Sequence, residues 1–351
     1  MMPWGDYHNE LGAGWSVYWR IPQASAGGLE VWWADFHRRR VMWRGSSPFA
    51  IVPYHRPLPG PSPPAPNFSF KDGFDFQCGG VAFTALKKSA LNNVADFATK
   101  DTEAISVQVD GEDGFNPARL TLAAKFQCGW YQYVHSWEFN GDGAIHPRVA
   151  MAGHLNPYAK NTSHVHHIYF RIDLDIDGQF PHDVVEQFDH LSLEDPPVGG
   201  GDTWTPIMAQ GKHLADPSTA RKWRVRNTVS QNTAGHFKGY DIEIPQMAGP
   251  DPYSTGDLWV SIYRGDGVQQ GEGVATEASA CSDKALETVY AAGPLDMVNG
   301  NDIVVWVVVR SHHEPRPDSE EVEYLPFHYE EFSITPRDFD VFHRRKHPRS
   351  R

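Results

Sequence analysis

Two histidines one residue apart, His164 and His166, are the first candidates for chemistry in this chain. They open the stretch SHVHHIYFRIDLDIDG, which runs from Ser163 to Gly178. Apolar and polar residues alternate along it, and this period of two predicts a half-buried β-strand. Because residues i and i+2 of a strand point to the same face, the two imidazoles would lie side by side, as a metal ion requires.

Asp173 and Asp175 repeat the i, i+2 spacing further along the same stretch, with carboxylate oxygens in place of ring nitrogens. His167 falls on the face opposite His166 and is a poorer ligand candidate. The chain contains 18 histidines, so a His-x-His pair also arises by chance. The metal-site hypothesis therefore needs support from other parts of the chain.

The composition predicts a mainly β protein. A chain of 351 residues can bury a large core, as one big β domain or two smaller ones. Aromatic residues make up 13% of it, with 12 Trp, and 31 Gly and 27 Pro are spread along its length. This mixture is typical of many short strands joined by turns. We expect a large antiparallel β-sandwich formed by one domain over residues 1–351, with a solvated basic tail at 343–351.

Charge and hydropathy exclude several classes of partner. The net charge of −13 argues against a nucleic-acid surface. No apolar run is long enough to span a membrane, so no membrane partner is expected. No basic region followed by an apolar stretch marks a secretory signal at the N-terminus. Three cysteines do not make a disulfide framework. A reducing, cytoplasmic location is therefore expected.

The strands expected from apolar and aromatic runs cover most of the chain. A hairpin is predicted from Trp130–Phe139, the turn residues 140–143 and Ala144–Met151. Val81–Ala95 is the best short helical candidate. Phe180–Leu193 is predicted to be loop or helix, and the proline-rich Pro57–Pro66 is predicted to be a long loop. The other predicted strands are Trp15–Ile21, Leu29–Phe36, Val41–Tyr54, Ala104–Val109, Ala118–Phe126, Lys222–Val229, Tyr240–Ile244, Leu258–Tyr263, Asp302–Arg310 and Glu323–Phe339.

Five stretches, in order, resemble the catalytic domain of the copper amine oxidases, and this domain only. The resemblance spans roughly Trp15 to Phe339. The stretches are VMWRGSSPFAIVPY (41–54), YQYVHSWEFNGDGAI (131–145), the His-x-His strand, DLWVSIYR (257–264) with residues 302–306, and SHHEPRPDSEEVEYLPFHYEEFSITPRDF (311–339). The resemblance implies copper, dioxygen, a small organic substrate and a homodimer.

The resemblance also implies the metal ligands. Copper would be held by His164, His166 and His313, since His313 and not His312 stands in the family's His-x-Pro-Arg pattern. Three imidazole ligands that leave coordination positions open suit a copper centre that reacts with dioxygen. A peripheral site, usually calcium, would use carboxylate and carbonyl oxygens, from Asp173, the Leu174 carbonyl, Asp175, Asp302 and the Ile303 carbonyl.

The organic cofactor of the family is topaquinone, and the resemblance implies Tyr131 as its precursor. Tyr54, in Val-Pro-Tyr, would hydrogen-bond the quinone. Asp75 would be the base that takes a proton from the substrate carbon, with Asp72 as a rival. Trp130, which precedes the precursor tyrosine, is a further candidate residue for binding the cofactor.

The cofactor motif departs from the family pattern at several positions. Trp130 replaces an Asn, Gln132 replaces an acid, and Arg56 replaces the Asp that ends Val-Pro-Tyr-Gly-Asp. Cys128 is read as a buried inert thiol, although a thiolate can bind copper. The leading hypothesis is a copper-dependent oxidase of the amine oxidase type, acting most simply on a primary amine. The alternatives are a quinone-free copper oxidase and a non-catalytic copper-binding or scaffold protein.

Overall fold

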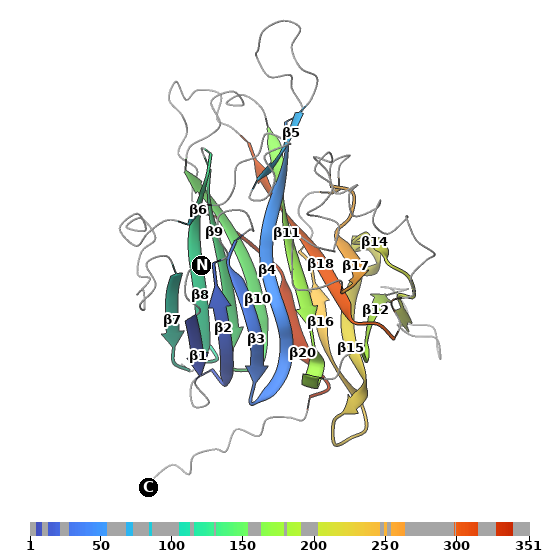
Figure 1. The fold of residues 1–351 in the computed structure, drawn as a ribbon. Coiled ribbons are helices and arrows are strands. Elements are labelled where there is room, and N and C mark those ends of the chain that lie inside the picture. The colour runs from blue at the N-terminus through green and yellow to red at the C-terminus, as the bar shows by residue number, and fades with distance from the viewer. Residues whose placement is uncertain are drawn as a thin grey trace, which may run out of the picture.

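The computed structural model consists of two antiparallel β-sheets (Figure 1). The structural statements below concern the residues that it describes, which are 5–8, 13–21, 28–54, 68–72, 84–85, 105–112, 116–129, 131–153, 163–178, 181–190, 203–245, 249–250, 254–263, 298, 300–314 and 328–339. Among these residues no helix is long and apolar enough to cross a membrane.

The first sheet has nine strands in the order β1-β2-β3-β4-β11-β18-β17-β14, with β5 paired to β4. Two neighbouring inner strands, β11 and β18, carry the histidines of interest. The bounds are β1 Gly5–His8, β2 Trp15–Arg20, β3 Glu30–Phe36, β4 Arg39–Tyr54, β5 Phe68–Asp72, β11 His164–Leu174, β14 Gly211–His213, β17 Leu258–Ile262 and β18 Ile303–His313.

The second sheet has eleven strands in the order β13-β12-β15-β16-β20-β10-β9-β8-β6, with β19 paired to β10 and β7 to β8. Two short 3₁₀ segments, η3 (Ile176–Gly178) and η4 (Pro217–Thr219), lie outside the sheets. The strand bounds are β6 Thr84–Ala85, β7 Ile105–Asp110, β8 Arg119–Cys128, β9 Tyr131–Asn140, β10 Ile145–Gly153, β12 Asp183–Asp189, β13 Thr203–Pro206, β15 Lys222–Gln231, β16 Phe237–Glu243, β19 His328–Glu331 and β20 Ser333–Arg337.

Aromatic side chains join the two sheets into a sandwich. The Trp15 ring lies 5.0 Å from that of Phe139, and Trp137 lies 6.0 Å from Phe170. All four are buried, and full burial of such a side chain contributes about 1.5–3 kcal/mol. A Cβ at Gly45 would come within 2.4 Å of the Trp137 ring, so the sheets approach too closely there for any side chain. The expected antiparallel β-sandwich is confirmed.

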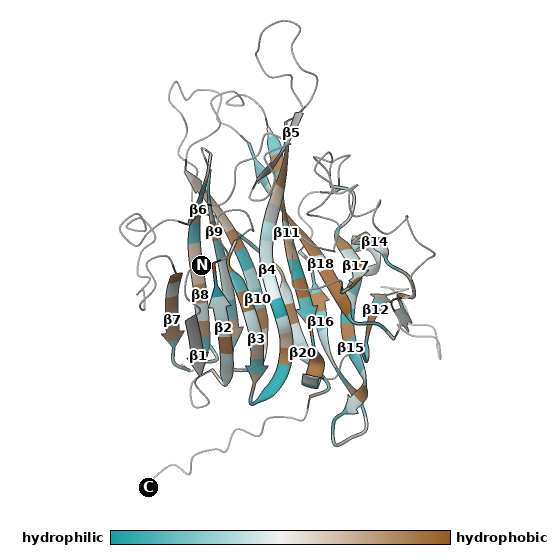
Figure 2. Ribbon diagram, in the orientation of Figure 1, coloured by the Kyte–Doolittle hydropathy of each residue, from teal (hydrophilic) through white to brown (hydrophobic). Residues whose placement is uncertain are grey.

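The outer face of the nine-stranded sheet is also buried. A second cluster of buried apolar side chains lies on it, formed by Ile51, Tyr169, Trp259, Val304, Trp306 and Val308. β18 is therefore buried on both faces, as its continuous apolar run predicts, and it is mostly brown in Figure 2. β11 is buried on both faces for the same reason, so its prediction as a half-buried strand was wrong. The strand ends at Leu174, and residues 176–178 form the 3₁₀ segment η3.

Most of the predicted strands are present, one non-strand prediction was wrong, and a second is contradicted at the two residues of it that are described. The predicted hairpin is β9 and β10, closed by the hydrogen bond from the Asn140 N–H to the Ala144 carbonyl (2.8 Å). Phe180–Leu193 is neither loop nor helix, because its central part is β12. Thr84–Ala85, inside the helical candidate, is a strand. Pro57–Pro66 and the rest of that helical candidate lie outside the described residues.

Candidate metal centre

Three histidines from β11 and β18 converge on one point between the sheets. His164 lies directly opposite His313 in the register of the two strands. Residues directly opposite on one face have Cβ atoms about 4.5–5.5 Å apart, and the two rings lie 4.9 Å apart. His166 joins them through the i, i+2 spacing, with its Nε2 3.1 Å from the Nε2 of His164. The ligand atoms of all three lie within 4.8 Å of one another.

All three imidazoles are buried, with exposed fractions of 1% for His164, 0% for His166 and 7% for His313. Burial lowers the pKa of His166 well below its ordinary value, and the neighbouring His164 and His313 lower it further. His166 is therefore neutral near pH 7 and has a lone pair for a cation. Three imidazole nitrogen donors held on two paired strands fit a copper ion. Among the described residues, this is the one such group of three or more His, Cys, Asp or Glu side chains.

Tyr131 reaches this point from the opposite sheet. It is the first residue of β9, it is 3% exposed, and its hydroxyl oxygen lies 3.2 Å from Nε2 of His164. Its ring stands edge-on to that of His166 at 4.8 Å. The phenol is therefore close enough to share the immediate surroundings of an ion held by the histidines.

Tyr133 also contacts the histidines, and the sequence reasoning missed it. Its hydroxyl oxygen lies 2.8 Å from Nδ1 of His166. The signal was available, since a residue two positions after Tyr131 on a strand must face the same way.

The glutamine that departs from the cofactor motif points away from the histidines. Gln132 lies opposite Gln127 on β8, and its Nε2 donates to the Gln127 Oε1 (2.8 Å). The Gln127 amide in turn donates to the carbonyls of Gly129 (2.7 Å) and Tyr131 (3.1 Å). These bonds hold the turn that leads into Tyr131. Cys128 is buried directly opposite Tyr131 and forms no disulfide with a described residue.

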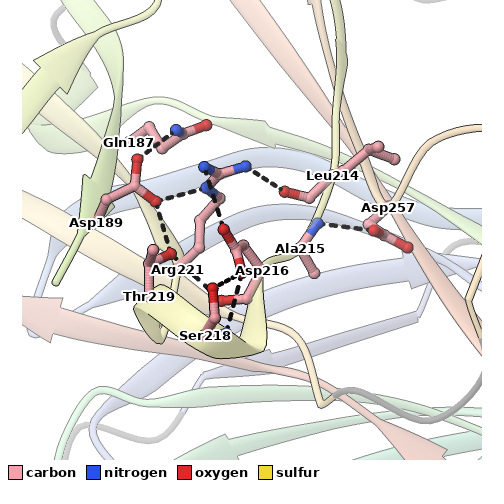
Figure 3. Close-up of polar contacts among 9 residues, drawn as sticks. All are labelled: Gln187, Asp189, Leu214, Ala215, Asp216, Ser218, Thr219, Arg221 and Asp257. Carbon is pink, nitrogen blue, oxygen red and sulfur yellow. Dashed lines mark hydrogen bonds and ion pairs between the residues drawn. The ribbon is translucent and has the colours of Figure 1, made fainter. Parts of the chain in front are cut away.

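The other face of the ligand strands is held by a buried arginine. The Arg310 Nε donates to Nδ1 of His167 (3.1 Å), and its guanidinium is ion-paired with Asp257. His167 therefore lies opposite the candidate ligands, as predicted. Figure 3 shows that Asp257 also accepts a hydrogen bond from the Ala215 N–H (2.7 Å).

The loop that carries Ala215 is itself held by Arg221 (Figure 3). Arg221 bonds Asp189 at the end of β12 (2.6 Å) and the Leu214 carbonyl (2.9 Å). This network connects the 214–221 loop to the Asp257–Arg310 pair behind β11 and β18.

The acids of the predicted peripheral site lie at the other end of β11. Asp173 faces away from His164 and His166 and contacts Arg171 (3.4 Å). Asp175 is 6% exposed, and its Oδ1 has no hydrogen-bond partner among the described residues. Burial raises its pKa, and Arg40 partly offsets this effect. Asp302 is half-buried and lies in the turn before β18.

A fourth acid, Asp183 at the start of β12, was not predicted. Burial raises its pKa to about 7, against hydrogen bonds from Asn227 and the Ile176 N–H that lower it; Asp175 and Asp302 raise it further. The acids thus interact electrostatically. Among the described residues, however, no three carboxylate oxygens lie within 4.8 Å of one another, as the ligand atoms of the three histidines do.

Several predicted site residues cannot be placed. Asp75 and Trp130 lie outside the described residues. Tyr54 ends β4 and Asp72 ends β5, where the structure describes the backbone and not these side chains.

Comparison with known proteins identifies a family. The family model of the copper amine oxidase enzyme domain matches residues 108–346. Among the curated relatives, diamine oxidase 1 of Nicotiana tabacum is 24% identical over 261 residues, which is 63% of this chain and 32% of its own length. The primary amine oxidase of Klebsiella aerogenes is 26% identical over 385 positions, covering 86% of this chain and 48% of its own. The chain thus spans about half or less of the length of these relatives.

Solved structures show the same fold. A copper-containing benzylamine oxidase from Hansenula polymorpha superposes with a TM-score of 0.66 at 19% identity, covering 93% of this chain and 59% of its own. The amine oxidase of Aspergillus nidulans gives 0.63 at 16% identity, covering 93% and 51%. The family match includes more than half of the 351 residues and all of β9, β11 and β18. The chain therefore belongs to the copper amine oxidase family.

Proposed function

We propose that the protein is a copper-dependent oxidase of the amine oxidase type, which uses dioxygen on a small organic substrate, most simply a primary amine. The observation that carries the proposal is the three-histidine cluster with a phenol beside it. His164, His166 and His313 are buried and convergent, and the Tyr131 hydroxyl lies 3.2 Å from His164.

Each side chain has a role that follows from its position. The three imidazoles would hold copper, which when bound would supply one-electron chemistry with dioxygen. The burial of the histidines and of Tyr131 keeps bulk water from competing for the ligand nitrogens. The Tyr131 hydroxyl lies 3.2 Å from Nε2 of His164, so the phenol stands beside a nitrogen that would hold copper.

Metal content tests the ligand set. Wild-type protein loaded with Cu(II) should hold one copper per chain, and His164→Ala and His313→Ala should each lose it. His312→Ala is the matched control, because His312 is next to His313 and contacts Ser163 on the other face of the strand pair (2.7 Å). Full copper content in His164→Ala would reject the assignment.

The identity of the organic cofactor needs a separate test. If Tyr131 matures to topaquinone, aerated copper-loaded protein should show a visible band and form a coloured adduct with phenylhydrazine, and Tyr131→Phe should show neither. A quinone-free copper oxidase is the second candidate. It is favoured by Gln132, which replaces an acid and pairs with Gln127, away from the histidines. Copper-loaded protein that gives no adduct would support this second candidate.

Proton abstraction from the substrate is assigned to Asp75, with Tyr54 as a hydrogen-bond partner of the cofactor. The order of the motifs along the chain supports this assignment. Asp75→Asn should keep its copper and lose about 10²–10⁴-fold in turnover. Asp72→Asn should lose much less. Wild-type turnover in Asp75→Asn would move the role to Asp72.

A peripheral calcium ion would be held by Asp173, Asp175 and Asp302 with the carbonyls of Leu174 and Ile303. The buried Oδ1 of Asp175 supports this proposal, because a hard cation would compensate its charge. Calcium added to metal-free protein should raise the melting temperature, and Asp175→Asn should remove that effect. An equal rise in both proteins would reject the site. The prediction of a reducing compartment rests on cysteine usage alone and stays a prediction.

A further inference from the structure

Tyr133 is the second inward-facing tyrosine of β9. Its hydroxyl oxygen lies 2.8 Å from Nδ1 of His166, and neither side chain has any exposed surface. The His166 ring also packs edge-on against Tyr131 at 4.8 Å, so two tyrosines from the opposite sheet flank it. A short buried hydrogen bond between packed rings restricts the rotation of both.

The two nitrogens of His166 have different partners. Nδ1 faces Tyr133, and Nε2 faces the Nε2 of His164 at 3.1 Å. A neutral imidazole carries one proton, on either nitrogen. Only the nitrogen without the proton can bind a metal ion. If Nε2 is to be a ligand, the proton must lie on Nδ1, and the Tyr133 oxygen must accept it.

We infer that Tyr133 is a positioning residue for this centre. It accepts a hydrogen bond from Nδ1–H of His166, and this leaves the lone pair of Nε2 directed at His164 and His313. A partner of this kind fixes both the tautomer and the orientation of a metal-binding histidine. The inference rests on the proposed function for the identity of the ion, while the tautomer can be measured without any metal.

The test compares Tyr133→Phe with a matched control, Tyr169→Phe. Both tyrosines are 0% exposed, and both variants delete a buried, hydrogen-bonded hydroxyl while keeping the ring. The Tyr169 hydroxyl bonds Ser254 (2.7 Å) and belongs to the cluster on the outer face of the sheet. Any loss of copper affinity that is caused simply by deleting a buried hydroxyl should therefore appear in both variants.

The first measurement is the tautomer of His166 in metal-free protein, from nitrogen–proton NMR correlations of histidine-labelled samples. His166→Gln identifies the signal. Wild type and Tyr169→Phe should show Nδ1–H, and Tyr133→Phe should shift the proton towards Nε2. Wild type with the proton on Nε2 would overturn the inference, and so would Nδ1–H in Tyr133→Phe.

The second measurement is Cu(II) affinity, by competition with a chelator, together with the electron paramagnetic resonance spectrum of the bound ion. Tyr133→Phe should bind about 10–100-fold more weakly and give an altered spectrum, whereas Tyr169→Phe should match wild type. Equal affinity and identical spectra in all three proteins would reject the positioning role. A wild-type protein that binds no copper would reject the proposed function, and the NMR result would still decide the tautomer.

Discussion

The charge state of Asp183 should make the folded protein less stable as the pH rises. Asp183 is 4% exposed on β12, and burial raises its pKa from 3.8 to about 7. Asn227 donates to its Oδ1 (2.9 Å) and the Ile176 N–H to its Oδ2 (3.4 Å), but these bonds do not compensate for the lost hydration. Between the two pKa values the folded state holds a proton that the unfolded state has released.

The sign and size follow from proton linkage. Because the folded state holds a proton on Asp183 that the unfolded state has released between about pH 4 and 7, the contribution of Asp183 to the free energy of unfolding falls as pH rises through that range. Each pKa unit corresponds to about 1.4 kcal/mol. Between about pH 5 and 8, the ionisation of Asp183 therefore lowers the free energy of unfolding by on the order of 3 kcal/mol. Asp183→Asn cannot ionise and should lose this part of the pH dependence.

Urea unfolding of metal-free protein, followed by tryptophan fluorescence at about pH 5 and 8, measures the effect. Relative to wild type, Asp183→Asn should gain on the order of 3 kcal/mol at the higher pH. Asp110→Asn is the control. Hydrogen bonds from Gln108 and Arg119 lower the Asp110 pKa, so it is ionised in both states throughout this range. Parallel curves for wild type and Asp183→Asn would refute the reasoning.

Three further results are expected. Gly28→Ala should destabilise the fold by about 1–3 kcal/mol, because its Cβ would lie 1.9 Å from His135 and 2.8 Å from the Ser47 carbonyl. His135→Ala should rescue it only in part, and an unchanged urea midpoint would contradict the packing. Gln127→Ala should cost about 1 kcal/mol and speed amide exchange around Tyr131; unaltered exchange would show that this amide does not hold the turn. Light scattering should give about twice the chain mass of 39.4 kDa; the monomer mass at micromolar concentration would exclude the homodimer.

The sequence predicted the parts of the protein that depend on local pattern. A period of two places His164 and His166 on one face and His167 on the other, because alternation is a property of any strand. The apolar run of β18 likewise indicated burial on both faces. β12 was missed because its sequence, DVVEQFD, contains acids that do not look like a buried strand. Glu186 is buried there only because Arg226, on the neighbouring β15, pairs with both of its carboxylate oxygens (2.8 and 3.0 Å).

The tertiary structure decided everything that depends on distant segments meeting. Nothing in β11 alone indicates that His313 lies opposite His164, because that register is set by the pairing of two strands far apart in the chain. The bond from Tyr133 to His166 requires the two sheets to pack at a particular offset. The raised pKa of Asp183 requires burial next to Asp175 and Asp302. Local spacing orients side chains along one strand, whereas long-range packing determines which of them share a site.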